Sequence, residues 1–123
     1  KDIVVDQSFN ASLSDLIREQ VLLNTREEIP HSVAVKIEKI ENINSKGKNI
    51  TAILAMIVVE RKSQKGILIG KGGSMLKEIG RSARINMKNF IPGKIYLELF
   101  VKVMPNWRKK ESKLIEFGYE EDF

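Results

Sequence analysis

The stretch that decides the fold runs from Ile67 to Ile79 and reads ILIGKGGSMLKEI. It contains three glycines within the four residues 70–73, which permits backbone angles that other residues resist. Apolar residues at spacings of three and four then predict a helix over 74–91. The unpaired amide groups at the start of that helix would face the loop and favour an anion, and Lys71 adds a positive charge. The stretch therefore predicts a phosphate-binding loop.

Two common nucleotide-binding motifs do not fit this loop. A P-loop has the pattern GxxxxGK[ST], but Gly66 and Gly70 have one residue too few between them. Gly72 also stands where the magnesium-binding hydroxyl should be, and Met75 stands where a dinucleotide fingerprint needs its third glycine. A small nucleotide-dependent enzyme is thus an alternative that the spacing disfavours. A glycine-rich turn between helices, without a ligand, is the simplest alternative.

Basic residues share one face of the predicted helix over 74–91. Their spacings are four, three and four residues, and Glu78 is the single acid of this stretch. A stripe of one charge sign that begins at a phosphate-ready loop favours a polyanion partner over a merely solvated face. This basic stripe consists of Lys77, Arg81, Arg84 and Lys88.

Periodicity predicts the remaining elements. Helical spacing indicates a helix over 12–24 that Ser12 would cap, and a weaker helix over 106–116. Alternation or β-branched composition indicates strands over 32–43, 50–60 and 94–104, with a polar turn at 44–49. Ser63 would cap a short apolar turn that leads into the glycine loop. The order helix, strand, strand, helix, helix, strand, helix predicts an α+β domain with helices packed on one face of a sheet.

Composition narrows the class of protein. The chain has 123 residues and a net charge of +5, which suits one basic globular domain. It has no cysteine and one histidine, which excludes disulfides and thiolate metal sites and predicts no metal. The longest apolar stretch is too short to span a bilayer and no signal peptide is visible, so cytoplasm is the expected location. A start at Lys1 instead of methionine suggests a fragment of a longer protein.

The stretch 67–79 resembles the core motif of the KH family, an apolar run followed by GXXG and a helix. The predicted order of elements is similar to the type II KH topology, which has a three-stranded mixed sheet. The resemblance implies a domain that binds single-stranded RNA. In such a domain the GXXG loop grips the backbone of about four nucleotides and the bases lie in an apolar groove.

A closer resemblance is to the Era family of bacterial ribosome-assembly GTPases, over roughly residues 13–120. It rests on TREEIPHSVAV at 25–35, VERKSQKG at 59–66, KIYLEL at 94–99 and the later Trp107, Arg108, Gly118 and Tyr119. It implies the C-terminal RNA-binding half, without enzyme activity, of a GTPase whose catalytic domain, with GTP and magnesium, is absent from this chain. The implied ligand is small-subunit ribosomal RNA near its 3′ end, and the implied role is maturation of that subunit.

The division of the chain follows from these patterns. Residues 1–11 are expected to be a lead-in or interdomain linker, residues 12–118 the RNA-binding domain, and residues 119–123 an acidic tail. The chain is expected to be a monomer. The resemblance to Era-like proteins also allows peripheral association with the inner face of the cell membrane.

The RNA-binding residues fall into three groups. The loop residues, with Ser74 after them, would contact phosphates, and they are Gly70, Lys71, Gly72 and Gly73. Apolar surface near the bases would come from Ile67, Ile69, Met75 and Leu76. For Leu76, a place in the hydrophobic core is the alternative. Electrostatic attraction would come from Lys65, Lys77, Arg81 and Arg84, and contacts to flanking nucleotides from Arg61 and Lys62.

Three alternatives remain open, one for Trp107 and two for the class of protein. Trp107 could stack on a base, but a core anchor after a strand is the preferred interpretation. Another type II KH protein, such as a ribosomal or transcription factor, is the alternative within the family. A protein-interaction domain with a solvated basic face is the alternative outside it.

Overall fold

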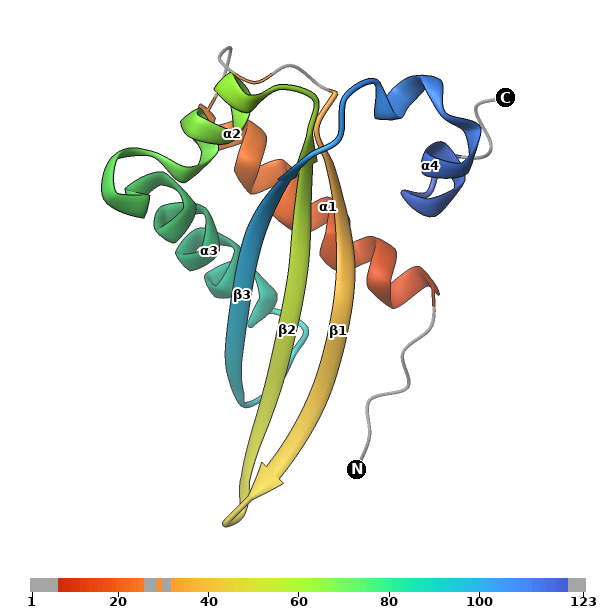
Figure 1. The fold of residues 1–123 in the computed structure, drawn as a ribbon. Coiled ribbons are helices and arrows are strands. Elements are labelled where there is room, and N and C mark those ends of the chain that lie inside the picture. The colour runs from red at the N-terminus through yellow and green to blue at the C-terminus, as the bar shows by residue number, and fades with distance from the viewer. Residues whose placement is uncertain (1–6, 26–28, 30–31, 120–123) are drawn as a thin grey trace.

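The computed structural model describes residues 7–25, 29 and 32–119. The chain forms long strands crossed on one side by helices (Figure 1). In chain order the elements are α1 (Gln7–Thr25), β1 (Ala34–Ser45), β2 (Lys48–Val59), α2 (Lys62–Ile69), the 3₁₀ turn η2 (Lys71–Gly73), α3 (Ser74–Met87), β3 (Lys94–Val103), the 3₁₀ turn η3 (Trp107–Lys109) and α4 (Glu111–Glu116).

The three strands form one mixed sheet in the order β1-β2-β3. The hairpin partners β1 and β2 are antiparallel, and the register runs from Ala34 opposite Val58 to Ser45 opposite Lys48. Strand β3 is parallel to β2, so the chain must cross over between them, and α2 and α3 make that crossover. The predicted α+β fold with a three-stranded mixed sheet, the type II KH arrangement, is confirmed.

The main core lies between the sheet and helices α1, α2 and α3. Alternate residues of β2 and β3 point into it, as the predicted strand periodicity requires, whereas a bulge between Ile37 and Lys39 shifts the alternation in β1. In β2 these include Ile53, Ala55 and Ile57, and every second residue of β3 from Ile95 to Val103 packs there as well. The helices contribute fully buried side chains, namely Leu13, Ile17, Val21, Leu68, Ile79, Ala83 and Met87.

A second, smaller cluster covers one end of the opposite sheet face. Trp107 is 2% exposed there, and its indole N–H donates to the carbonyl oxygen of Ser32 at 3.0 Å. The ring packs against Met56 and Val58 of β2 and lies edge-on to Phe117. The preferred interpretation of Trp107 as a core anchor is therefore confirmed. The C-terminal segment packs on the face that α1 to α3 leave open.

Several element boundaries differ from the predictions. Helix α1 begins at Gln7, so Ser12 lies inside it and does not cap its start. Helix α2 begins after Arg61, and the side-chain oxygen of Gln64 accepts from the amide groups of Glu60 and Arg61 at 3.0 Å each. The residue whose side chain caps the start of that helix is therefore Gln64, and not Ser63 as predicted.

The other differences concern where elements end. Helix α3 ends at Met87 and not at residue 91, and turns follow it to Ile91. The predicted helix over 106–116 is interrupted at Lys110, which has extended backbone angles between η3 and α4. The polar turn is narrower than predicted, because pairing continues to Ser45 and Lys48. The division into linker, domain and tail stays a prediction, since residues 1–6 and 120–123 lie outside the described part.

Candidate nucleic-acid interface

The glycine loop makes a sharp bend between α2 and α3. Gly70 has φ 75° and ψ 175°, an angle pair that essentially only glycine adopts. Gly72 and Gly73 follow with φ of 63° and 82° in the left-handed region. Two backbone hydrogen bonds stabilise the bend. The Gly70 amide donates to the carbonyl of Gly66 at 2.9 Å, and the Gly73 amide donates to the carbonyl of Gly70 at 3.1 Å.

The three glycines serve the loop in different ways. A Cβ atom on Gly70 would lie 2.7 Å from both the backbone nitrogen and the Cβ of Met75, so the start of α3 fits only against a glycine. A Cβ on Gly72 or Gly73 would meet nothing within 4 Å. These two positions therefore need glycine for backbone conformation alone, and the space above them is open to a ligand.

The start of α3 supplies the polar groups of the site. Gly73 precedes this 14-residue helix and offers it no side-chain cap. The Ser74 amide donates to the carbonyl of Lys71, so the open amide groups of the first turn are those that follow Ser74. The helix dipole adds a partial positive charge at the same point. Lys71, Gly72 and Ser74 are all exposed. The arrangement can bind an anion such as a phosphate group.

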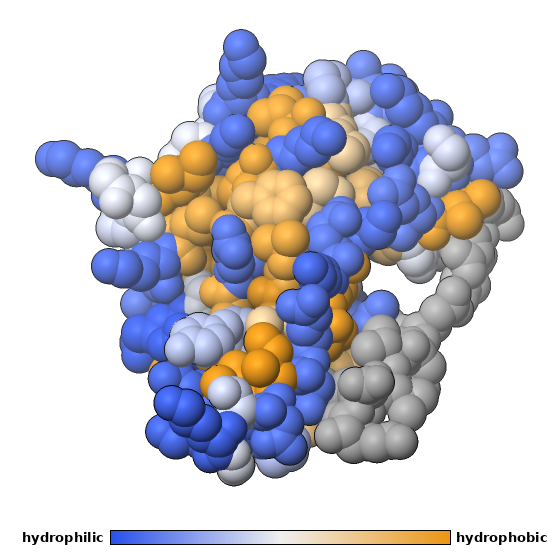
Figure 2. Space-filling model, turned by 60° about the horizontal axis from the view of Figure 1, so that its bottom comes forward, coloured by the Kyte–Doolittle hydropathy of each residue, from blue (hydrophilic) through white to orange (hydrophobic). Residues whose placement is uncertain are grey.

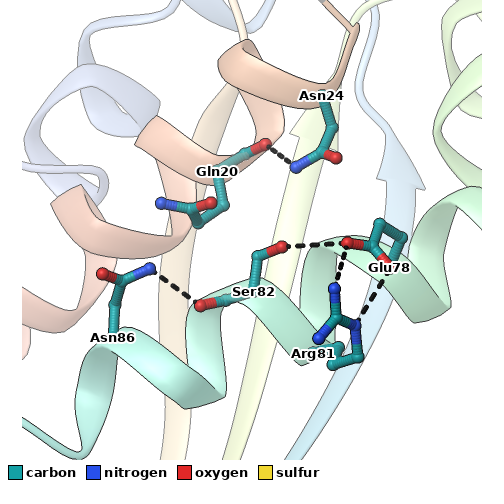
Figure 3. Close-up of polar contacts among 6 residues, drawn as sticks. All are labelled: Gln20, Asn24, Glu78, Arg81, Ser82 and Asn86. Carbon is teal, nitrogen blue, oxygen red and sulfur yellow. Dashed lines mark hydrogen bonds and ion pairs between the residues drawn. The ribbon is translucent and has the colours of Figure 1, made fainter.

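The basic side chains around the loop are not equivalent. Arg61, Lys62, Lys77, Arg84 and Lys88 are exposed, and Lys65 is half-buried. Arg81 instead forms a two-bond ion pair with Glu78, with nitrogen to oxygen distances of 2.9 and 3.1 Å (Figure 3). The hydrogen bond from Arg81 lowers the pKa of Glu78. The spacing of three residues between Glu78 and Arg81 could have revealed this pair. The carboxylate of Glu78 offsets the charge of Arg81 and so lowers the net charge of the basic stripe.

Polar side chains at the junction of α1 and α3 bond within their own helices. The Asn24 amide donates to the Gln20 carbonyl at 2.7 Å, and that of Asn86 to the Ser82 carbonyl at 2.9 Å (Figure 3). The Ser82 hydroxyl lies 3.3 Å from the Glu78 carboxylate. Each of these hydrogen bonds lies within a single helix, and none of them involves the loop 70–73.

The predicted apolar contact residues are each half-buried. Ile67, Ile69, Met75 and Leu76 pack against the core and also retain exposed surface. Their position suits both predicted uses, as core and as a surface for bases. Next to Ile67, a hollow of about 500 Å³ is lined by Glu60, Arg61, Ser63 and Gln64 with the chain after β3. Arg61 reaches that hollow, whereas Lys62 is not among its lining residues.

The edge of β3 completes the surroundings of the loop. The sheet ends at β3, so the outer backbone groups of that strand have no strand partner, and both α2 and α3 contact it. Unpaired backbone groups beside an apolar surface can bond the edges of bases or an added strand. Within residues 7–25, 29 and 32–119, no three His, Asp or Glu side chains gather as metal ligands would. No described helix is long and apolar enough to cross a membrane.

The sequence matches the KH domain family over residues 28–108. This is more than half of the chain, and the matched region contains both the glycine loop and the sheet. The chain belongs to the KH domain family.

Similar proteins indicate which members of the KH domain family this chain resembles. The GTPase Era of Nostoc sp. is 57% identical over 118 residues, which cover 96% of this chain and 35% of that protein. The GTPase Era of Synechocystis sp. is 52% identical over 118 residues, which cover 96% of this chain and 36% of that protein. The chain thus spans about a third of the length of these relatives. The predicted resemblance to the Era family is confirmed.

Two solved structures share the fold. Era of Aquifex aeolicus, bound to GDP and aluminium fluoride, superposes with a TM-score of 0.82 at 38% identity, over 95% of this chain and 38% of that one. Era in complex with MgGDPNP and nucleotides 1506–1542 of 16S ribosomal RNA superposes with a TM-score of 0.85 at 38% identity. That match covers 93% of this chain and 37% of the other.

Proposed function

We propose that this chain binds single-stranded RNA through the loop Gly70–Gly73. One observation carries the proposal: three glycines with positive φ open onto the uncapped start of a 14-residue helix, and Lys71 stands between them. Phosphate groups would accept from the loop and helix amides, and the Lys71 ammonium would add charge. Free nucleotides are the weaker candidate, because the loop lacks the residues that position a nucleotide's magnesium ion.

The surroundings of the loop suit a strand of RNA rather than a single phosphate. The basic stripe runs along α3 away from the loop, so it can follow successive phosphates. Half-buried apolar side chains lie on the other side, where unstacked bases would find a surface. A duplex hides its bases and would offer only its phosphates, so the site favours single strands.

The natural ligand in this proposal is small-subunit ribosomal RNA near its 3′ end. Support comes from the similar Era structure, which was solved with nucleotides 1506–1542 of 16S ribosomal RNA. The chain would be the RNA-binding part of a longer GTPase that acts in maturation of the small subunit. GTP and magnesium would bind the part of that protein outside this chain, and the chain itself would be a non-catalytic, cytoplasmic monomer. Peripheral contact of the parent protein with the membrane belongs to the same proposal.

Fluorescence anisotropy over a salt series tests the proposal. Four probes are compared: a single strand with the 3′-end sequence of small-subunit ribosomal RNA, a scrambled strand, and the duplex of each. We expect the ribosomal single strand to bind most tightly and to weaken as salt rises. Equal binding of the scrambled strand would remove the ribosomal assignment and favour another type II KH protein. Absence of binding at low salt would contradict RNA binding and favour a protein-interaction domain.

A further inference from the structure

The face of the sheet that points away from α1 to α3 is only partly covered. The C-terminal segment covers one end of it, over Met56 and Val58. Beyond that segment, two aromatic side chains on β3 stand exposed, Tyr96 at 54% and Phe100 at 38%. Figure 2 shows hydrophobic side chains gathered on this side of the molecule, with hydrophilic ones around them. We call this area the open sheet face.

The register of the sheet explains why Tyr96 is accessible. Its neighbour across the parallel pair is Ala52, and next to that residue on β1 stands Glu41. The small side chain of Ala52 leaves the ring uncovered on that side. The ammonium group of Lys94 lies 5.2 Å from the ring centroid. Tyr96 is thus a ring with a cation at one side and free surface at the other.

The open sheet face is continuous with the glycine-loop side of the molecule. A hollow of about 530 Å³ crosses the face, and its lining includes Ala52, Leu54, Tyr96 and Glu98 from the strands. Arg84 of α3, a member of the basic stripe, also lines it. Because β3 is the edge strand, Arg84 reaches the hollow around a single strand. One charged side chain therefore borders both surfaces.

We propose that the open sheet face is a second contact surface for single-stranded RNA, which leaves the glycine loop past Arg84 and stacks a base on Tyr96. The proposal rests on the RNA binding proposed above and extends its path. Aromatic rings that stack on bases are a general means of holding single strands, and they tolerate different sequences. Phe100 lies four residues along the same face, roughly 13 Å from Tyr96 at the usual rise of a strand. That separation leaves room for further nucleotides.

The charges on this face indicate which part of the RNA would point toward it. Glu98 stands exposed between the two aromatic positions and would repel a phosphate. A carboxylate does accept from the amino groups on base edges, such as N4 of cytosine. Lys94 at the margin could follow the backbone, while Lys39 is held by Glu41 at 3.2 Å. Bases would therefore face the sheet and phosphates would face the solvent.

RNA length provides the test. A six-nucleotide RNA that fills only the loop site is compared with RNAs extended by six nucleotides at the 5′ or the 3′ end. Anisotropy measures their binding to the unmodified chain, to Tyr96→Ala and to the control variant Ile115→Ala, which removes an exposed apolar side chain from α4. We expect one extended RNA to bind more tightly than the short one. We expect Tyr96→Ala to weaken that RNA by roughly tenfold and to leave the short RNA unchanged.

Unchanged binding of the short RNA also shows that the Tyr96→Ala chain is folded. A 2-aminopurine placed in the extension provides a second readout, since stacking on Tyr96 quenches its fluorescence and the substitution should restore it. If neither extension improves binding, the open sheet face is not an RNA surface and a protein partner should be sought for it. Equal loss for short and extended RNA in Tyr96→Ala would also overturn the proposal. If the unmodified chain does not bind even the short RNA, the proposed function itself fails.

Discussion

The hairpin tip and the loop 70–73 are both turns that combine glycine with lysine, but they differ in the structure that follows each turn. At the hairpin tip, Lys46 and Gly47 have φ of 54° and 75°, and Lys48 follows. The loop 70–73 has the same ingredients, positive φ at its glycines and a lysine among them. The hairpin tip joins two strands that pair with each other up to the turn. The loop instead opens onto the start of α3.

This difference teaches that glycine and charge do not make an anion site on their own. Amide groups of paired strands bond across the sheet, and strand dipoles largely cancel. At the start of a helix several amide groups point outward together, and their partial charges add. The hairpin tip therefore serves as a built-in control for the glycine loop.

The largest effect is expected from reversing charge in the glycine loop. Lys71→Asp with Gly72→Asp should weaken single-stranded RNA binding about 100-fold, which corresponds to losing two charge-assisted contacts. The fold should survive, because aspartate tolerates left-handed angles and nothing crowds position 72. Lys46→Asp with Gly47→Asp makes the same change in charge at the hairpin tip. Anisotropy should show only a few-fold loss there, and equal losses in both variants would mean that net charge alone attracts the RNA.

Stability should separate the two turns as well. Gly70→Ala places a Cβ atom against the backbone of Met75 in an unfavourable conformation, so we expect the free energy of unfolding to fall by about 2 to 3 kcal/mol. Gly47→Ala meets nothing within 4 Å and should cost about 1 kcal/mol through its positive φ alone. Urea denaturation followed by circular dichroism measures both. Similar losses at the two positions would contradict the close approach of α3 to Gly70.

Salt dependence should distinguish the lysines around each turn. Lys77→Gln removes a charge from the basic stripe and should reduce the slope of log affinity against log salt by about 0.7, the value for one phosphate contact on a single strand. Lys48→Gln removes a charge at the hairpin tip and should leave the slope unchanged. Anisotropy at five or six salt concentrations gives both slopes. A reduced slope for Lys48→Gln would show that RNA also reaches the hairpin.

The smallest effect concerns the acid within the basic stripe. Glu78→Gln breaks the ion pair with Arg81 and removes a negative charge from the basic stripe, so RNA binding should become tighter. We expect a gain of only about threefold, because an exposed ion pair of this kind is weak. Glu111→Gln on α4 makes the same charge change away from the loop and should have a smaller effect. The ratio of the two affinities is the quantity to measure. Weaker binding by Glu78→Gln would mean that Glu78 holds Arg81 in position for the RNA.

The sequence predicted the elements whose periodicity and environment agree. Strict alternation marked β3, and its core-facing residues from Ile95 to Val103 are where that pattern places them. The loop and α3 are equally predictable, because the glycines end at Gly73 and the helical spacing of apolar residues begins directly after Ser74. These features depend on neighbours in the chain, so local patterns suffice for them.

The features that sequence reasoning missed depend on distant contacts. Helix α1 extends back to Gln7, and Phe9 in this extension packs edge-on against Phe90, 81 residues later, with ring centroids 6.5 Å apart. Ser12 with Asp15 resembles a helix start, so the local signal was misleading. The signal that could have pointed to the open sheet face is the second alternating set of β3, with Tyr96 and Phe100. Its accessibility depends on Ala52 across the sheet, which no local pattern shows.

The central claim is that the backbone of the glycine loop contacts phosphate, and amide chemical shifts test it most directly. A ¹⁵N-labelled sample of the unmodified chain is titrated with a six-nucleotide single-stranded RNA. The account predicts the largest shifts at the amides of Gly72, Gly73 and Ser74, with the Gly47 amide unmoved. Shifts as large at the hairpin tip as at the loop, or none at the loop during saturable binding, would contradict it.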